Sequence, residues 1–499
     1  MKVKAATLIT VMLTLLSGMH AQGPCPTAFS TTTQPNLQIS KDLICTVNQV
    51  YGGGGLVGVP NNGPLGSTDQ KSAAFKHSVH FQDSSLASFV PLNSAIGSAL
   101  SQLPLTSPAS GFTFSFNSSL GVYARTTENF GPILSERADT IGKHKLFLGV
   151  SYQYFNFDKV DGVSLHSFPA VFQHEHEGCP SPNPNNITCI NGTGPPVITK
   201  DYVSTQNRID LKAHQVTAVA TFGFTDRFDL SAAIPILVVG MDMTSAATIN
   251  NLEATDASIV PACCVHQFAP PPATIPGETL GPQYTAPSNS FPYYNSATFF
   301  RSNSASGIGD VVFRAKYRVL KAEKFGLALG GDFRAPTGDQ LNFLGSGTWG
   351  IRPFATFSYS GRFSPHANIG FQANGKSVLG GNISTDTSDR IPNAFTYSFG
   401  ADLGISARAS LSADFFGATL INVKKVATTA TTTIAADGTV INVPGLQTST
   451  GTSNEASIAA GGKVNPFGRL LVTANVLFRV NDAGLHYKPV PLIGLSYTF

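Results

Sequence analysis

The chain is built from amphipathic segments in which apolar and polar side chains alternate. In the C-terminal segment, small or polar residues such as Gly494 and Ser496 separate larger apolar ones. Because successive side chains of a β-strand point to opposite faces, such a segment has one apolar and one polar face. Strands of about ten residues with this pattern are typical of transmembrane β-barrels, whose outer face meets lipid. The apolar face of this last segment comprises Pro491, Ile493, Leu495, Tyr497 and Phe499.

The same alternation recurs along the chain from residue 145 onward. An even number of strands is expected of a single-chain bacterial barrel, and it places both ends of the barrel on the periplasmic side. We predict strands near residues 145–157, 206–224, 228–244, 310–321, 325–335, 350–360, 363–375, 393–405, 408–420, 455–465, 469–481 and 487–499.

The connections between these segments alternate between short and long. The short links are residues 225–227, 322–324, 360–362, 406–408 and 466–469. The long ones are rich in Gly, Pro, Ser, Thr and Asn and cover residues 158–205, 245–306, 336–349, 376–392 and 424–455. Short periplasmic turns and long extracellular loops are characteristic of outer-membrane barrels. The sequence therefore predicts an all-β fold, a transmembrane antiparallel β-barrel of about twelve strands in the bacterial cell outer membrane.

The composition supports a membrane barrel rather than a soluble domain. Charged residues make up 12% of the chain, against about 25% in soluble domains. After roughly the first two dozen positions, no apolar run reaches the roughly 18 residues of a membrane-spanning helix, which excludes a helical membrane protein. The formal net charge is +3 and the basic residues are scattered, so nucleic acid is not an expected partner.

The first residues have the pattern of a secretory signal peptide. Lys2 and Lys4 precede an apolar stretch from Ala5 to Leu16, and Ala21 ends a usable cleavage site. We predict three parts: a signal peptide at residues 1–21, an N-terminal segment at residues 22–140 and the barrel at residues 141–499.

The N-terminal segment does not follow the barrel pattern. Leu92, Ile96, Leu100 and Leu103 recur at helical spacing, and alternating phenylalanines precede Gly121. We expect a periplasmic or lumen-filling segment with a short helix and a small hairpin. For residues 22–85, which are rich in Gly, Ser and Asn, a mobile linker is an equally good interpretation.

Six cysteines are compatible with an oxidising compartment. Cys25 with Cys45, and Cys179 with Cys189, would close loops as disulfides, although the spacing does not determine the pairing. The adjacent Cys263 and Cys264 with His266 are the one candidate metal cluster. We expect neither a metal site nor a cofactor.

Charged residues concentrate on the polar face of two neighbouring strands, where the alternation points them into the lumen. Charged rings select ions in pores, so one interpretation is a constriction that favours anionic or polarised solutes. The other is a buried charge network that closes a narrow barrel, and the pattern does not decide between them. The predicted lumen-lining residues are Asp310, Arg314, Lys316, Arg318, Asp332 and Arg334.

Several short motifs make the chain similar to a known family. They are residues 306–310 (SGIGD), 336–339 (PTGD), 344–347 (LGSG) and 366–370 (HANIG), with the turn at residues 224–228 and Ile234-Pro235. Together they resemble the bacterial outer-membrane family assigned to the MetA pathway of phenol degradation, over roughly residues 130–499. The resemblance implies uptake of aromatic or other hydrophobic compounds and carries over no catalytic residue.

The end of the chain resembles the C-terminal signal by which bacterial outer-membrane barrels are recognised for insertion. Its residues are Leu495, Tyr497 and Phe499. This resemblance implies the barrel-insertion machinery as a partner, beside outer-membrane lipid and a small-molecule solute.

These patterns predict a channel and not an enzyme. His144 and His366 have no evident serine partner, and His174-Glu175-His176-Glu177 lies in a loop without a third ligand. We expect an outer-membrane channel for passive uptake of small molecules, aromatic or hydrophobic ones among them. The alternative is a structural or adhesive surface barrel that acts through its long extracellular loops; an embedded lipid-modifying enzyme ranks third.

Overall fold

The computed structural model describes most of the barrel and parts of the N-terminal segment. The described residues are 38–43, 56–60, 75–76, 89–100, 103–107, 114–117, 122–125, 129–178, 194–250, 252, 264–268, 283–285, 295–322, 324–383, 386–434 and 440–499. The predicted signal peptide lies outside them, as do Cys25, Cys45, Cys179, Cys189 and Cys263. The side chains of Cys264, His266, His174 and His176 are also outside the description.

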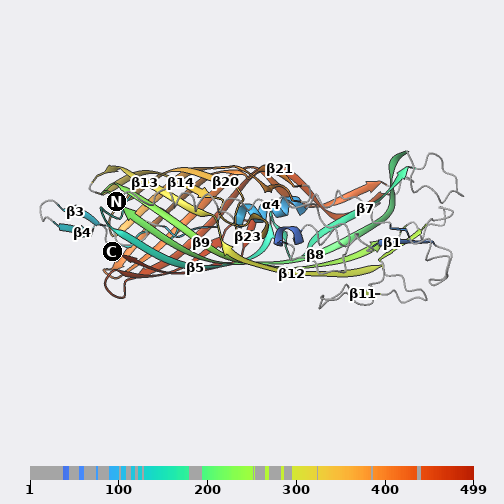
Figure 1. The fold of residues 1–499 in the computed structure, drawn as a ribbon, viewed down its shortest axis with the longest axis horizontal. Helices are drawn as coiled ribbons and strands as arrows, with labels where there is room; N and C mark the ends of the chain where they lie inside the picture. The colour runs from blue at the N-terminus through green and yellow to red at the C-terminus, as the bar shows by residue number, and fades with distance from the viewer. Residues whose placement is uncertain are drawn as a thin grey trace, which may run out of the picture.

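A closed antiparallel sheet of twelve strands forms the body of the molecule, as predicted (Figure 1). β12 and β13 act as one strand, because both pair with β9, from Ser296 opposite Thr248 to Tyr317 opposite Phe228. β24 pairs with β5 and so closes the sheet. In order round the barrel the strands are β5 (Leu146–Val160), β8 (Gly194–Gly223), β9 (Phe228–Asn250), β12 (Ser296–Ile308) with β13 (Val311–Lys321), β14 (Phe325–Ala335), β15 (Gly350–Tyr359), β16 (Phe363–Asn374), β19 (Asn393–Ser406), β20 (Ala409–Ile434), β21 (Val440–Val464), β22 (Leu470–Arg479) and β24 (Val490–Thr498).

Shorter helices and strands accompany the twelve strands of the barrel. Among the described residues, no helix is long and apolar enough to cross a membrane. The smaller elements are β1 (Leu56–Pro60), β2 (Phe75–Lys76), α4 (Phe89–Leu100), β3 (Phe114–Asn117), β4 (Val122–Arg125), β6 (Val163–Ser164), β7 (Phe168–Gly178), β10 (Cys264–Phe268), β11 (Gln283–Thr285), the 3-10 helix η5 (Gln340–Asn342), β17 (Lys376–Asn382), β18 (Thr387–Arg390) and β23 (Leu485–Tyr487).

The outside of the barrel is an apolar belt. Leu329 and Phe399, for example, are 51% and 57% exposed, whereas Thr356 and Ser358 on the inner face are buried. An apolar outside and a polar inside is the reverse of a soluble domain, and it fits strands that separate lipid from a lumen. The protein is therefore an outer-membrane β-barrel, with the C-terminal Phe499 at the end that carries the short turns (Figure 1).

The longest strands reverse this polarity part of the way along. β8 has 30 residues, although about 9–11 suffice to cross a bilayer. On its outer face, apolar Val216 gives way to exposed Lys212, while on its inner face polar Thr217 gives way to buried Leu211. Beyond this point the strand meets water outside and an apolar core inside. The reversal near residue 214 therefore marks the outer surface of the membrane.

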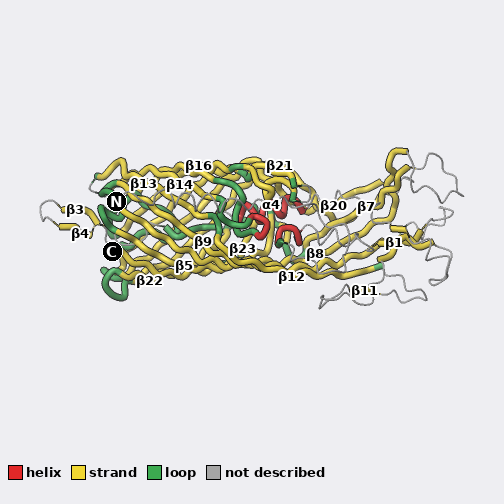
Figure 2. Tube along the Cα trace, viewed as in Figure 1, coloured by secondary structure: helices red, strands yellow, loops and turns green. Residues whose placement is uncertain are grey.

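The predicted helix is α4, and it lies inside the barrel about halfway along its length (Figure 2). Leu92 and Ile96 are fully buried among apolar residues of the extended strands, such as Leu211 on β8 and Met241 on β9. Gly97 lets α4 approach β17, because a Cβ there would lie 2.7 Å from a methyl carbon of Leu379. The N-terminal segment is thus lumenal at α4, whereas its division from the barrel at residue 140 stays a prediction.

The long connections are more ordered than the sequence predicts. Residues 168–178 and 194–205 are strand, as are residues 245–250, 296–306, 424–434 and 440–455. Residues 376–392 contain the β17–β18 hairpin, and residues 336–349 contain η5. The prediction of loops was wrong here because it required an apolar outer face, which the strands lose once they leave the membrane.

We expect the polarity reversal to be measurable on one strand. Ile234 and Ala246 both lie on the outer face of β9, but Ile234 is in the apolar belt and Ala246 is beyond it. Ile234→Arg should lower the free energy of unfolding from lipid vesicles by about 2–4 kcal/mol, because the guanidinium faces hydrocarbon. Ala246→Arg is the control and should change it by less than about 0.5 kcal/mol. Urea titrations of both variants test this, and equal losses would contradict the assigned membrane boundary.

Candidate functional site: the filled lumen

A strap of residues 129–141 crosses the lumen close to the short turns. At its start, the Asn129 side-chain amide donates a hydrogen bond to Ser364 Oγ on β16 at 2.7 Å. At its end, the Ile141 backbone N–H donates to Asp229 on β9 at 3.0 Å. Since β13, β14 and β15 separate these two strands, the strap spans the inner mouth of the barrel.

Glu136 is the centre of an ion-paired cluster between the strap and the barrel wall. It pairs with Arg314 and, at 3.2 Å, with Lys316 Nζ, both on β13. Lys316 also donates to the backbone carbonyls of Arg137 and Asp139, at 3.1 and 2.9 Å. The side chains of Glu136 and Lys316 are 8% and 3% exposed, so solvent screens this pair little.

Asp332 on β14 extends this cluster along the wall. It accepts two hydrogen bonds from Arg314, at 2.6 and 2.9 Å, and two from Arg352 on β15, at 3.0 and 2.5 Å. The guanidinium carbons of Arg314 and Arg352 lie 5.1 and 5.8 Å from the centroid of the Phe354 ring. Both distances are within the range of cation–π attraction. The cluster is therefore held by charge pairing on one side and by an aromatic face on the other.

The other predicted lumen residues are buried and paired as well. Arg318 Nη1 lies 2.9 Å from Asp139 of the strap. Arg334 approaches Asp310 at 3.6 Å and donates to Asn374 Oδ1 at 2.8 Å. All six side chains lie inside the barrel, and the structure brings Arg314, Lys316, Arg318 and Asp332 together around the strap. Their contribution to ion selectivity stays a prediction.

Asp310 connects three of the glycine-rich motifs, at residues 306–310, 336–339 and 344–347. Its carboxylate accepts hydrogen bonds from the backbone N–H groups of Gly338 and Ser346, at 3.1 and 2.8 Å, and from Ser346 Oγ. A Cβ on Gly345 would lie 2.4 Å from Asp310 Oδ1, and one on Gly338 would lie 2.5 Å from a backbone carbonyl oxygen. Only glycine at these two positions lets residues 336–349 fold down onto the carboxylate.

A second charge cluster holds the start of the strap. Lys463 Nζ on β21 donates to the backbone carbonyls of Phe130, Gly131 and Pro132, at 3.1, 2.7 and 2.7 Å. Lys463 is 1% exposed. Three carbonyl acceptors match the three donors of an ammonium group, so this lysine ties the strap to the wall.

His366 lies in the same region of the wall. Its Nε2 is 2.6 Å from Asp414 Oδ1, and its Nδ1 is 3.5 Å from Asp402 Oδ2. Both ring nitrogens thus face carboxylates, and the side chain is 1% exposed. His366, Asp402 and Asp414 therefore form a buried charge network in the wall.

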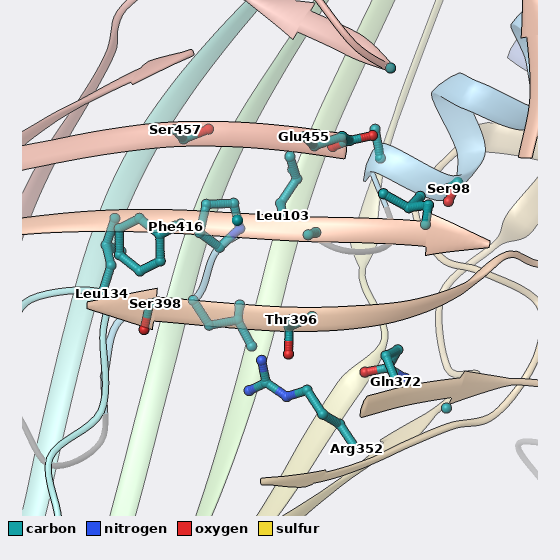
Figure 3. A pocket seen from close by; sticks show the side chains of 18 of the residues that line it. Ser98, Leu103, Leu134, Arg352, Gln372, Thr396, Ser398, Phe416, Glu455 and Ser457 are labelled. Atoms are coloured by element: carbon teal, nitrogen blue, oxygen red, sulfur yellow. The ribbon is translucent and has the colours of Figure 1, made fainter. Parts of the chain in front are cut away.

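A cavity of about 380 Å³ lies between the strap, α4 and the wall (Figure 3). Leu134 and Glu136 of the strap and Ser98 of α4 contribute to its lining. Phe416 and Ser457 lie on two further strands of the wall, where Figure 3 shows them around the same space as Arg352. The cavity is therefore lined by apolar and aromatic side chains together with many polar and charged ones, among them Arg352 and Glu455.

A helical turn at residues 39–43 packs against the inner wall further outward, where Ile39 and Leu43 are buried. Ser40 Oγ donates to the Leu341 carbonyl at 2.6 Å, and Asn303 Nδ2 donates to Asp42 at 2.7 Å. Asp42 is 5% exposed. Burial raises the pKa of the Asp42 carboxyl to about 6, although the hydrogen bond from Asn303 and the charge of Arg301 oppose the shift.

The sequence interpretation missed the acidic partners on the strap. Glu136, Arg137 and Asp139 are three charges within four positions of a charge-poor chain. That density was a usable sign of a buried network. Lys463 lies more than 300 residues from the strap in sequence, and only the closed barrel brings the two together.

The predicted insertion residues are all exposed on the lipid-facing side of β24 or at its end. Leu495, Tyr497 and Phe499 are 48%, 37% and 54% exposed, and the rings of Tyr497 and Phe499 lie 4.7 Å apart. Their recognition by insertion machinery stays a prediction.

Because Glu136 pairs with two buried cations, we expect one substitution at this position to weaken the attachment of the strap to the wall. Glu136→Gln should lower the opening free energy of the strap by about 3–5 kcal/mol, because Lys316 and Arg314 are left buried without this carboxylate. Hydrogen exchange at the amides of residues 133–141 measures this. The double variant Glu136→Gln with Lys316→Met should recover part of the loss. Lys159→Met, in the exposed pair with Asp482, is the control and should lower the opening free energy of the strap by less than about 1 kcal/mol.

The attachment of residues 39–43 to the inside of the barrel, which we call docking, should weaken as the pH rises. The docked Asp42 has a raised pKa, so the docked state binds the proton more tightly than the released state does. Docking is therefore strongest near pH 4 and weakens towards pH 6, above which it levels off. Hydrogen-exchange opening free energies at pH 4.5 and 7, corrected for intrinsic exchange, should show this for the native chain and not for Asp42→Asn. An unchanged value in the native chain would contradict it.

The comparisons with known structures return bacterial outer-membrane barrels. The COG4313 outer membrane channel from Pseudomonas putida F1 has 10% identity and a TM-score of 0.37, over 73% of this chain and 99% of that one. A Pseudomonas aeruginosa FadL homologue has 13% identity and a TM-score of 0.27, over 72% and 90%. The outer membrane protease OmpT from Escherichia coli has 9% identity and a TM-score of 0.22, over 73% and 99%. No curated protein is significantly similar in sequence.

One family model matches part of the chain. It is described as "Putative MetA-pathway of phenol degradation" and covers residues 217–438. This range contains Asp310, both glycines that close on it and the buried pairs of β13 and β14. The resemblance to the MetA-pathway phenol-degradation family is therefore confirmed over residues 217–438.

Proposed function

We propose that the protein is an outer-membrane channel for passive uptake of small molecules, aromatic or hydrophobic ones among them. The observation that carries the proposal is the internal cavity of about 380 Å³ in the middle of the lumen. Its volume lies in the range of about 300–1,000 Å³ that is usual for small-molecule sites. A barrel whose only task was to anchor surface loops would gain stability by filling this space with side chains.

The lining supports a solute with a ring and at least one polar group, because aromatic side chains lie beside charged ones such as Arg352 and Glu455. Phe354, Phe416 and Tyr487 contribute aromatic surface, and Asn368 and Ser398 contribute hydrogen-bonding groups. Aromatic rings favour offset or edge contacts with a planar solute. The family description, with its reference to phenol degradation, agrees with such a solute.

The charged residues support a gated route rather than an open pore. Arg314, Lys316 and Arg318 face Glu136 and Asp139 of the strap, so their charges are largely compensated. We propose that they hold the strap, in preference to acting as an anion-selective constriction. A solute would pass from the cavity to the inner mouth when the strap moves aside. We propose no catalytic residue and no cofactor.

Filling the cavity should slow uptake without changing the barrel. Ala95 and Ala99 of α4 line the cavity and are partly exposed to it. The variant Ala95→Phe with Ala99→Phe should reduce the rate of 4-nitrophenol entry into proteoliposomes by about tenfold, since larger side chains occupy the route. The matched control is Ala460→Phe, which adds the same ring on the exposed outer face of β21. Equal rates for all three proteins would contradict the proposal.

A second candidate function rests on the strands that extend beyond the membrane. β20 and β21 contain 26 and 25 residues, and β8 and β9 extend in the same direction. These ribbons provide a platform for a structural or adhesive surface protein. A folded barrel that conducts no ions in planar bilayers and takes up no 4-nitrophenol would favour this second function.

A further inference from the structure

Five residues with basic or aromatic side chains lie at the outer edge of the apolar belt. We define this interface patch as Tyr152, Tyr154, Lys212, His214 and Lys488. Lys212, His214 and Lys488 are exposed, Tyr152 is 40% exposed and Tyr154 is partly exposed. The patch is where the outer face of β8 changes from apolar to polar, so it lies at the level of the lipid headgroups.

The sheet places the two lysines on either side of one residue. Asn156 on β5 is the register partner of Lys212 on β8. On its other side, the Lys488 backbone N–H donates to the Asn156 carbonyl at 2.9 Å. Neighbouring strands lie about 4.8 Å apart, so the two lysine backbones are about 10 Å apart. Their ammonium groups can therefore reach a single anionic headgroup.

The aromatic members of the patch are held in place beside the lysines. Tyr152 Oη lies 2.8 Å from His214 Nδ1, and the ring centroids of Tyr154 and His214 are 4.9 Å apart. Tyrosines at membrane interfaces keep the ring in the apolar region and the hydroxyl in the headgroup region. The fixed rings thus define where the headgroups of the adjoining lipid lie.

The neighbouring carboxylates are already paired. Asp210, two residues from Lys212 on the same face, lies 2.9 Å from Arg208 and 3.0 Å from His166. Asp482 pairs with Lys159 at 3.1 Å. Within the described part of the chain, Lys212 and Lys488 have no carboxylate within 4.0 Å. The patch therefore presents positive charge directly above apolar surface.

We propose that the interface patch binds the phosphate groups of an anionic lipid in the outer leaflet. The phosphate of a lipid can contact the basic residues of the patch while its acyl chains contact the apolar belt below them. Its charge meets Lys212 and Lys488, and its chains cover the belt residues below them, such as Val216 and Val150. A free phosphate ion would gain only the first contact. This inference is independent of the proposed transport function.

Lipid binding to the purified full-length protein tests the proposal. The protein in maltoside micelles is titrated with bisphosphorylated lipid A or with phosphatidylcholine, and bound lipid is counted by native mass spectrometry. The native chain should prefer lipid A. The variant Lys212→Gln with Lys488→Gln should bind lipid A about tenfold or more weakly, since each basic residue near an anionic surface contributes substantially to attraction.

Two further variants separate the patch from net charge and from folding. Lys143→Gln with Lys324→Gln removes two exposed lysines at the opposite, periplasmic end, and it should bind lipid A as the native chain does. Lys212→Arg with Lys488→Arg keeps the charge and should retain binding. All variants must first show the gel mobility of the folded barrel. Equal lipid A binding by the two glutamine variants, whether both native-like or both weakened, would overturn the proposal.

Discussion

In hydrocarbon an unpaired backbone amide or carbonyl costs several kcal/mol, and this constraint governs the whole molecule. The sheet satisfies it by closing β24 on β5. Closure fixes which faces meet lipid and which meet the lumen, because side chains alternate along every strand. It also creates an interior that other parts of the chain must fill or leave open.

The interior is filled in two ways that match the polarity of the surrounding wall. Within the membrane the wall is polar, and the strap meets it with charges and backbone carbonyls, as at Glu136 and Lys463. Beyond the membrane the inner wall is apolar, and α4 meets it with Leu92 and Ile96. The cavity lies between the strap and α4, where the side chains of neither segment fill the lumen.

The same change of polarity organises the outer surface. The wall that is apolar outside and polar inside becomes polar outside and apolar inside near residue 214 of β8. This level carries the lysines and tyrosines of the interface patch and lies outward of the charged strap. One pattern along the strands thus determines the membrane boundary, the site of headgroup contact and the depth of the plug.

The sequence by itself determined the barrel, because alternation is a local property that each strand carries within about ten residues. It also determined that Arg314, Lys316 and Asp332 point inward and that a short helix lies near residue 92. Only the tertiary structure decided what these charges contact. Glu136 lies 178 and 180 residues from Arg314 and Lys316, and no local pattern encodes a pairing across a closed lumen. The ordered extensions of β8, β9, β20 and β21 were also decided there, because beyond the membrane their outer faces no longer carry the apolar pattern that identifies a lipid-facing strand.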